Sequence, residues 1–365
     1  MYRHDKRIVM TLDAGGTNFV FSAIQSYHEV IKPISLSANS NDLERCLNVL
    51  LEGFTRVKEQ LQETPVAISF AFPGPADYEH GIIGDLPNFP TFRGGIALGP
   101  FLKEHFNIPV FINNDGNLFA YGEALAGKLP EINARLEETG STKRYKNLLG
   151  LTLGTGFGAG VVINNQLLTG DNGCGGDVWI MRNKKYPEMI AEEGVSIRAV
   201  KRVYQELSKT EASTLSPKDI FDIAEGYIPG NKQAAINSFR ELGEMVGHAL
   251  VNALNIVDGL VVIGGGVSGA SKYILPGVIK EMNRSINTFA GNSFSSLQSK
   301  VFNLEQEEDT KKFFMDKDTT VLIPFSKKKV PYTNHKKIGI AISTLGTNEA
   351  VALGAYTFAL AQLDN

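Results

Sequence analysis

Short apolar runs alternate with polar and glycine-rich segments along the first part of the chain. The opening stretch, RIVMTLDAGGTNFVFSAI, has apolar residues on both sides of a Gly-Gly-Thr corner, which predicts a strand, a tight turn and a second strand. Segment 42–62 repeats apolar residues at helical spacing, and Asn41 with Glu44 offers a capping box for its start. The run PVAISFAFPGP predicts a buried strand that ends at prolines. Strand, helix and strand in this order indicate an α/β lobe with a partly parallel sheet.

A similar pattern returns further along the chain. Residues 148–164, LLGLTLGTGFGAGVVIN, again predict a strand, a corner of glycine and threonine, and a strand. The two corners lie about 140 residues apart, which suggests an internally duplicated architecture. Segment 232–257 predicts a helix on which Gly243 and Gly247 would allow a neighbour to approach closely. This helix leads directly into the strand GLVVIGGGVSG.

Two charged stretches interrupt the apolar pattern. Residues 128–147, KLPEINARLEETGSTKRYKN, are dominated by polar and charged side chains, and residues 303–337 alternate acidic and basic clusters around a short TVLIPF strand. We expect both to be solvated surface inserts or an edge hairpin. A basic contact surface for a partner is the lesser alternative, because each basic run has acidic residues nearby.

Composition limits the classes of protein that fit. The chain has 365 residues, 43% apolar and 21% charged, which is typical of a soluble globular protein of one or two domains. A formal net charge of −3 gives no signal for nucleic-acid binding. Cys46 and Cys174 can form neither a disulfide scaffold nor, alone, a four-ligand zinc site. The N-terminus is polar and no window is as long as a membrane span, so we expect a cytoplasmic protein without membrane contact.

The stretch NIPVFINNDGN, residues 107–117, ends an apolar strand in two amides and a carboxylate just before an expected helix. Asn and Asp commonly satisfy free backbone donors at such a helix start, so Asp115 could simply be a cap. A carboxylate at the tip of a buried strand could also do chemistry. The residues of this stretch alone leave both interpretations open.

The glycine corners share one chemical property. Glycine exposes backbone N–H groups and tolerates positive φ, so successive amides can face an anion such as phosphate. GTGFGAG superficially fits a dinucleotide-binding motif, but the strand VVIN follows it where that motif requires a helix. The chain also lacks a P-loop motif. Phosphate binding of another kind remains the functional alternative to ordinary turns.

Taken together, the motifs resemble the sugar kinase/actin/heat-shock ATPase superfamily and, more narrowly, the ROK family of sugar kinases and related repressors. LDAGGTNFVFSAI resembles the first phosphate motif, LGTGFGAGVVINNQLLTG the second, DGLVVIGGGVS the adenosine motif and NEAVALGAY the closing helix. FPGPADYEHGIIGDLPN and NNDGNLFAYGE support the narrower assignment. The motifs are in the family's order and cover nearly the whole chain outside the two inserts.

This resemblance implies an α/β fold of the two-lobed actin-like ATPase (ribonuclease H-like) type, with duplicated lobes and a central cleft. We expect the first lobe to cover residues 1–126 together with 346–365, which carries the C-terminal helix. The second, larger lobe would cover 127–345, with the ATP adenosine site and both inserts, 128–147 and 303–337. The family also implies a hexose substrate, ATP and Mg²⁺, and we expect a homodimer.

The resemblance also implies roles for particular residues. Asp115 matches the family's general base, and a carboxylate within reach of a sugar hydroxyl can take its proton during phosphoryl transfer. Asp13 matches the aspartate that orients Mg²⁺ through water. The implied sugar-binding residues are Gly74, Asn88, Asn114, Asp115, Asp177 and Glu192. The implied ATP-binding residues are Asp13, Gly15, Gly16, Thr17, Gly154, Thr155, Gly156, Gly264, Gly265 and Gly266.

One segment departs from the family pattern. After the second phosphate motif the family has G-E-x-G-H and a zinc-binding cysteine cluster, whereas this chain reads CGGDVWIMRNKKYPEMIAEEGVS. Asp177 replaces the glutamate and Ile180 the histidine, so we expect no structural zinc. Trp179, Ile180 and Met181 would then hold the loop by apolar packing. Glu192 matches the family's sugar-binding glutamate, with Glu193 as the alternative.

Three functions remain open after this comparison of motifs. The leading hypothesis is an ATP-dependent kinase acting on the 6-hydroxyl of a hexose, with glucose first and N-acetylmannosamine, N-acetylglucosamine, fructose or allose as alternatives. A sugar-responsive repressor would carry a DNA-binding module before the first motif, yet only seven residues precede Ile8. A non-catalytic sugar-binding regulator is the third possibility, because the GGDVW segment is altered.

Overall fold

The computed structural model describes residues 1–86, 91–315, 319–332 and 336–365. Its internal contacts divide the chain into two compact units. Unit 1 comprises residues 1–127, 160–176 and 345–365, and unit 2 comprises 128–159 and 177–344. The bounds of unit 1 differ from those expected for the first lobe mainly by the added segment 160–176.

The sheet of unit 1 begins with the hairpin that the sequence predicts. Strands β1 and β2 are antiparallel, whereas β1, β5 and β8 run parallel to one another. The order is β3-β2-β1-β5-β8, and β4 pairs with β2. The strands are β1 (Val9–Ala14), β2 (Asn18–Gln25), β3 (His28–Glu29), β4 (Ile34–Ser37), β5 (Ala67–Ala71) and β8 (Val110–Asn113), with a separate small pair, β6 (Ala76–Asp77) and β7 (Ile82–Ile83).

Alternation along these strands gives the sheet two different faces. One set of side chains, including Met10 and Phe70, joins a single apolar core with α1 (Leu43–Gln60) and α2 (Leu98–Phe106). Helix α1 is capped by Asp42, whose side chain accepts from the Arg45 N–H, so the predicted capping box of Asn41 and Glu44 is wrong. The alternate residues of the strands face the other way.

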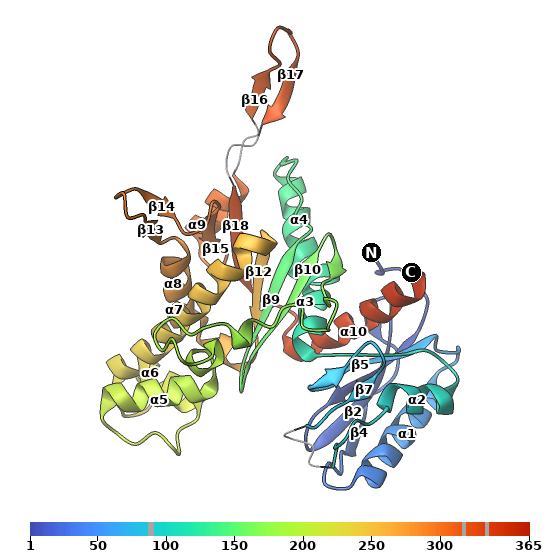
Figure 1. The fold of residues 1–365 in the computed structure, drawn as a ribbon. Helices are drawn as coiled ribbons and strands as arrows, with labels where there is room; N and C mark the ends of the chain where they lie inside the picture. The colour runs from blue at the N-terminus through green and yellow to red at the C-terminus, as the bar shows by residue number, and fades with distance from the viewer. Residues whose placement is uncertain (87–90, 316–318, 333–335) are drawn as a thin grey trace. The chain divides into compact units, whose positions relative to one another are not determined.

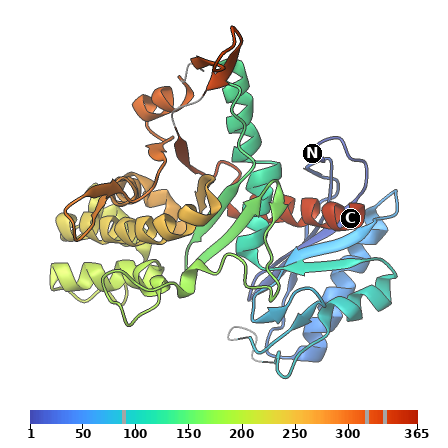
Figure 2. The same cartoon turned by 45° about the horizontal axis from the view of Figure 1, so that its top comes forward.

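Helices α3 (Asp115–Leu125) and α10 (Thr347–Asp364) pack against each other and α10 lies along β1, β5 and β8 (Figure 1, Figure 2). Two glycines make this packing possible. A Cβ added at Gly122 would overlap the Ala350 carbonyl, and one added at Gly354 would overlap the Leu118 carbonyl. The two backbones therefore approach as closely as glycine permits.

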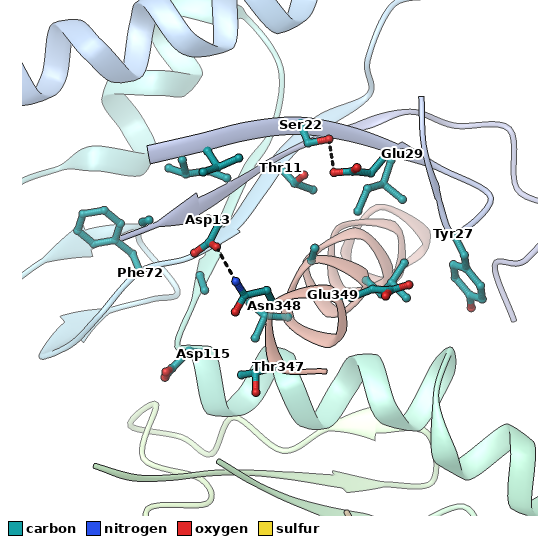
Figure 3. A pocket seen from close by; sticks show the side chains of 18 of the residues that line it. Thr11, Asp13, Ser22, Tyr27, Glu29, Phe72, Asp115, Thr347, Asn348 and Glu349 are labelled. Carbon is teal, nitrogen blue, oxygen red and sulfur yellow. Dashed lines mark hydrogen bonds between the residues drawn. The ribbon is translucent and has the colours of Figure 1, made fainter. Parts of the chain in front are cut away.

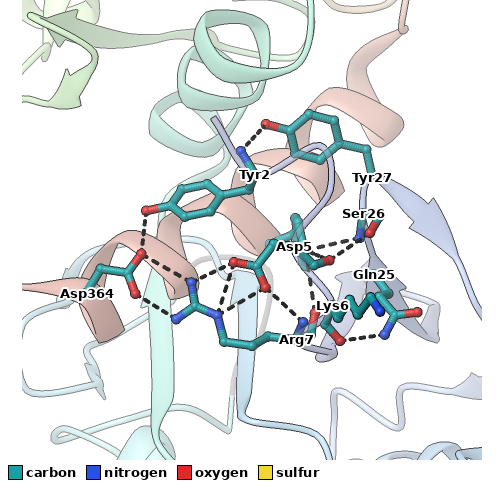
Figure 4. A network of polar contacts seen from close by, with 9 residues as sticks. Tyr2, Asp5, Lys6, Arg7, Gln25, Ser26, Tyr27 and Asp364 are labelled. Carbon is teal, nitrogen blue, oxygen red and sulfur yellow. Dashed lines mark hydrogen bonds and ion pairs between the residues drawn. The ribbon is translucent and has the colours of Figure 1, made fainter.

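Polar contacts tie the two ends of the chain together within unit 1 (Figure 4). The Arg7 guanidinium pairs with Asp5 at 2.7 Å and with Asp364 of α10 at 2.6 Å. The Tyr2 hydroxyl donates to the same Asp364 carboxylate at 3.0 Å. These contacts fix the last turn of α10 against the start of the chain.

The second sheet repeats the arrangement of the first. Its order is β11-β10-β9-β12-β18-β15, in which β9, β12, β18 and β15 run parallel. A short edge strand, a hairpin and then parallel strands thus follow the same order in both sheets, which confirms the duplicated architecture. The strands are β9 (Leu148–Leu153), β10 (Phe157–Ile163), β11 (Gln166–Leu167), β12 (Leu260–Gly264), β15 (Lys300–Asn303) and β18 (Lys337–Ile342).

The longest helix of unit 2, α7 (Lys232–Val257), confirms the helix predicted over 232–257 and packs against α8 (Ser271–Met282). A Cβ at Gly243 would overlap the Ile274 carbonyl, which confirms the expected close approach of a neighbour. The other helices of unit 2 are α4 (Lys128–Glu138), α5 (Ile197–Ser208), α6 (Pro217–Glu225) and α9 (Glu307–Phe314), with 3₁₀ turns η1 (Val178–Ile180), η2 (Ala191–Gly194) and η3 (Gly266–Ala270). Within the described ranges, no helix combines the length and apolar character needed to cross a membrane.

The two charged stretches are more ordered than their composition suggested. Residues 128–138 form α4, on which Leu129, Ile132 and Leu136 are buried, so the expectation of a solvated insert or hairpin was wrong there. The many charged residues of this stretch made its apolar stripe at helical spacing hard to recognise in the sequence. The second stretch contains α9 and an exposed hairpin, β16 (Thr319–Leu322) with β17 (Lys329–Tyr332). Another exposed hairpin pairs β13 (Ser285–Asn287) with β14 (Ser293–Ser295).

Candidate active site

The turn between β8 and α3 separates a structural asparagine from the candidate catalytic carboxylate. Asn114 is the N-cap of α3, and its side-chain oxygen accepts from the Asn117 N–H at 2.6 Å. Asn113 is buried and accepts from the Asn117 side-chain amide at 2.9 Å. Asp115 is the first residue of the helix and accepts only from the adjacent Gly116 N–H, at 2.9 Å, in the contacts of the described residues. Capping is therefore the role of Asn114, and the interpretation of Asp115 as the cap is wrong.

Asp13 lies near the end of β1, directly opposite Val20 of β2. Its carboxylate accepts a hydrogen bond from the Asn348 side chain at 3.2 Å. Asp13 is exposed, yet partial desolvation by neighbouring protein atoms raises its pKa above the ordinary value, because desolvation disfavours the charged form. Asn348 belongs to the first turn of α10, so the C-terminal helix brings an amide to the predicted magnesium-orienting residue. The sequence motif for the closing helix did not indicate this contact.

Asp13 and Asp115 line one pocket of about 860 Å³ in unit 1 (Figure 3). Thr347 and Asn348 of α10 line the same pocket, as does Gly16 of the corner between β1 and β2. The fold thus brings together two carboxylates that are far apart in the sequence. Asp13 lies near the end of β1, and Asp115 begins α3 two residues after the end of β8.

The other predicted residues of unit 1 differ in their surroundings. A Cβ at Gly16 would meet nothing within 4 Å, whereas one at Gly15 would lie 2.8 Å from the Asn18 carbonyl oxygen. Thr17 is exposed, and its carbonyl accepts from the Ala38 N–H. Gly74 packs near the Tyr78 hydroxyl, 3.1 Å from an added Cβ. Asn88 lies outside the described residues.

In unit 2, the corner between β9 and β10 is held by a glutamate. The Phe157 N–H donates to Glu192 Oε2 at 3.1 Å, next to the predicted phosphate-binding residues Gly154, Thr155 and Gly156. Arg198 of α5 pairs with both Glu192 and Glu193 at 3.1 Å. Of the two glutamates, Glu192 is the one that contacts this corner. Arg198 was missed because a single arginine in an amphipathic helix carries no motif.

The glycines after β12 serve the backbone in different ways. Gly265 has φ +89°, and an added Cβ would overlap the Leu153 carbonyl, so only glycine fits without strain. An added Cβ at Gly266 would meet nothing within 4 Å, which leaves open space beside the chain. Gly264 is the buried last residue of β12. The positive φ expected of corner glycines is found at Gly265, whereas Gly15, Gly16, Gly154 and Gly156 do not adopt it.

The segment that departs from the family pattern is held differently from the prediction. Trp179 and Ile180 are 38% and 58% exposed, so the expected apolar cluster is wrong, and Val178 is the buried residue of η1. Asn183 anchors the loop instead: its side chain is buried and accepts from the Lys185 and Tyr186 N–H groups at 2.9 and 3.0 Å. Asp177 is exposed and does not cap η1.

A resident metal has few ligands available. Among the residues that the structure describes, no three His, Cys, Asp or Glu side chains are grouped so as to hold a metal ion. Cys46 is buried and Cys174 exposed, and both are free thiols. A metal that binds through Asp13 would therefore need additional ligands from water or from a phosphate.

The ROK family model matches residues 9–305, so the chain belongs to the ROK family. Membership and the repeated sheets confirm the expected α/β fold, the two-lobed actin-like ATPase fold with duplicated lobes. A crystal structure of glucokinase from Parabacteroides distasonis is similar to this chain, with a TM-score of 0.90, 61% sequence identity and 99% of each chain covered.

Curated relatives include both kinases and repressors. A glucokinase from Thermotoga maritima is 28% identical over 290 residues, which are 74% of this chain and 85% of that protein. A xylose repressor from Bacillus spizizenii is 25% identical over 277 residues, 72% of this chain. The chain spans 65% of the length of that repressor.

Proposed function

We propose that the chain is an ATP-dependent sugar kinase that transfers the γ-phosphate to the 6-hydroxyl of a hexose, with glucose as the first candidate. The observation that carries this proposal is the pocket of unit 1, which contains both Asp13 and Asp115. The glucokinase with 61% identity over nearly the whole chain supports the same activity. We infer both the kinase activity and the sugar substrate from the pocket and from this similarity.

Asp115 is the proposed general base. Phosphoryl transfer requires positioning, charge neutralisation and an oriented hydroxyl nucleophile, with little covalent chemistry from the protein. Because Asn114 caps α3, the Asp115 carboxylate is not needed to hold the helix end. It can accept the proton of a sugar hydroxyl as the bond to phosphorus forms. Asn114 keeps its side-chain N–H₂ group for a sugar hydroxyl, while its oxygen serves the cap.

Asp13 is the proposed residue that orients Mg²⁺. The metal prefers oxygen ligands and retains several waters, which suits one carboxylate steadied by the Asn348 amide. When bound, Mg²⁺ would neutralise charge on the ATP phosphates. Gly16, Gly154 and Gly266 have open space where a side chain would stand, so their backbones can be approached by phosphate oxygens or a nucleoside. Gly15, Thr17, Thr155, Gly156, Gly264 and Gly265 complete the proposed ATP-binding set.

Sugar selection is the finer part of the proposal. Gly74, Asn88, Asp177 and Glu192 are proposed to contact the sugar with Asn114 and Asp115. Glu192 also binds the Phe157 N–H and Arg198, so a sugar hydroxyl would join an existing polar network. An N-acetylamino sugar or fructose is the alternative substrate. We further propose that the protein works in the cytoplasm as a homodimer and contains no structural zinc.

Asp115→Asn tests the assignment of the base. A coupled assay of ADP release across glucose, fructose, N-acetylglucosamine and N-acetylmannosamine would identify the substrate first. The variant should then lose about 10²–10⁴ in kcat while sugar affinity changes only a few-fold, because the amide keeps the shape of the carboxylate. Asp258→Asn is the matched control, since Asp258 is exposed and lies in a left-handed conformation that Asn tolerates. Near wild-type turnover in Asp115→Asn would exclude the base role.

A non-catalytic sugar-binding regulator is the second candidate function. The similarity to a xylose repressor favours this candidate. So does Asp177, which replaces the family's glutamate, is exposed and does not cap η1. The two candidates differ in turnover: a regulator would bind a hexose by calorimetry yet release no ADP with any sugar of the panel. Sugar-dependent ADP release above the ATP-only control excludes this candidate.

A further inference from the structure

The hairpin of β16 and β17 in unit 2 forms a small sheet of its own (Figure 1). Both strands are exposed along their whole length. The hairpin nevertheless carries several large apolar side chains, all of them exposed: Val321, Leu322, Ile323, Phe325, Val330 and Tyr332. A two-stranded hairpin on its own is at best marginally stable in water, so we expect a partner to cover an apolar hairpin of this kind.

The register of the hairpin determines which backbone groups point away from it. The Ile323 N–H donates to the Lys328 carbonyl at 2.9 Å, so the backbone of Ile323 is directed at the other arm of the hairpin. Because this direction alternates along an antiparallel strand, Leu322 and Thr320 direct their N–H and C=O groups outward. The outward residues of β17 are the two that lie opposite them in register, Lys329 and Pro331. Among the residues that the structure describes, no third strand pairs with either edge.

The two edges of the hairpin differ in their protection against further pairing. Proteins commonly block an exposed edge strand with proline or lysine. The edge of β17 has both, since Pro331 has no N–H to donate and Lys329 adds a charge. By contrast, residues 319–323 contain neither proline nor a charged side chain. An uncharged apolar edge of high β-propensity promotes aggregation when it is left free, so the edge of β16 is the one that requires a partner.

We propose that β16 pairs with β16 of a second copy of this chain, antiparallel across a twofold axis. An antiparallel edge is self-complementary, as a twofold interface requires. With the axis at Val321, the outward groups of Thr320 bond to those of the partner's Leu322, and the two Val321 side chains face each other. This proposal names the interface of the homodimer proposed above and is independent of the kinase activity.

The charges and the outer edges of the hairpin favour a closed dimer. The paired hairpins form a sheet in the order β17-β16-β16-β17, so the lysines of β17 lie one strand away from the axis and like charges are kept apart. Both outer edges are then β17, where Pro331 opposes the addition of further strands. The assembly therefore stops at two copies.

Disulfide trapping tests the position of the axis. The full chain with Cys174→Ser lacks its exposed thiol, and Val321→Cys in this background places two thiols across the axis. Facing residues of such a pair have Cβ atoms about 4.5–5.5 Å apart, close to the span of a disulfide. We expect mild oxidation of dilute protein to give a covalent dimer on a non-reducing gel.

Val330→Cys in the same background is the matched control. Val330 is the same residue type and is 40% exposed, against 44% for Val321. It lies on β17, so three strand spacings, about 14 Å, would separate it from its counterpart in the dimer. This variant should remain a single chain on the gel. Equal cross-linking of the two cysteine variants would indicate random collisions and would overturn the proposal.

Thr320→Pro tests the hydrogen bonds of the free edge. It removes an outward N–H and leaves the ladder to β17 intact, as Pro331 does on the opposite strand. Sedimentation equilibrium should show a dimer for the wild type and for Thr320→Val, which keeps both the N–H and the shape. In Thr320→Pro the dissociation constant of the dimer should rise about tenfold or more, because one hydrogen bond is lost on each side of the axis.

Two other results would overturn the proposal. A monomeric wild-type chain would leave the edge of β16 to a partner of another kind. A dimer that Val321→Cys does not cross-link and Thr320→Pro does not weaken would use a different surface. None of these measurements depends on turnover, so a dimer that meets them and has no kinase activity would refute only the proposed function.

Discussion

Replacing Gly354 by alanine should destabilise unit 1, although the same change stabilises most helices. An added Cβ would lie 2.6 Å from the carbonyl carbon of Leu118 and closer still to its oxygen. These are backbone atoms of α3, so the clash cannot be relieved by rotating a side chain. Overpacking of this kind costs about 1–3 kcal/mol, and the gain in helix propensity returns about 1 kcal/mol. Because backbone atoms cannot give way, the cost lies at the upper end of this range, about 3 kcal/mol, and the net loss in the free energy of unfolding is about 2 kcal/mol.

Urea unfolding can assign this loss to unit 1. The single tryptophan, Trp179, belongs to unit 2, so its fluorescence follows unit 2 while circular dichroism follows helices of both units. In Gly354→Ala the circular dichroism transition should move to lower urea, with a smaller change in fluorescence. Gly269→Ala, where an added Cβ meets nothing within 4 Å, is the control. A Gly354→Ala protein as stable as wild type would refute the reasoning on close packing.

Three further predictions concern charge, thiols and metal. Because partial desolvation raises the pKa of the exposed Asp13, its protonated form favours folding at low pH, and this contribution is lost as the pH rises through the folded-state pKa. Asp13→Asn should therefore raise the urea midpoint at pH 7 and change it little at acidic pH. An equal change of the midpoint at both pH values would contradict a raised pKa of Asp13. Burial raises the pKa of the Cys46 thiol to about 11, so a thiol reagent should modify Cys174 in the native chain and Cys46 only after unfolding. The purified protein should contain no stoichiometric zinc and should keep its melting temperature in EDTA. One zinc per chain by elemental analysis would show that the residues around Asp177 do not correspond to the family's zinc segment as assigned.

The regular elements were predictable because each leaves a local signal in the sequence. Apolar periodicity located α7 at its observed bounds, and the Gly-Gly-Thr corner located the hairpin of β1 and β2. The same signal was overlooked in α4, where charged residues surround a stripe of only three buried aliphatic side chains. Apolar periodicity therefore predicts a helix most readily when charged residues on its exposed face do not outnumber its buried apolar residues.

The contacts that complete the candidate site were less predictable. Asn348 reaches Asp13 across more than three hundred residues, and no spacing rule connects them. Asn114 and Asp115 both suit a helix start, so the sequence could not distinguish the cap from the free carboxylate. Backbone geometry made that distinction, because the cap must precede the first helical residue by one position.

The position of α10 in unit 1 has a consequence for synthesis on the ribosome. This helix packs on β1, β5 and α3, yet it is translated after the whole of unit 2. Every residue assigned to unit 2 precedes Leu345, so unit 2 can be complete while the first sheet still lacks the helix that covers one of its faces. The usual N-terminal-first order of domain folding is then reversed. The nascent sheet of unit 1 keeps one face exposed until α10 has been synthesised, which makes this sheet the part of the nascent chain that most needs protection from aggregation.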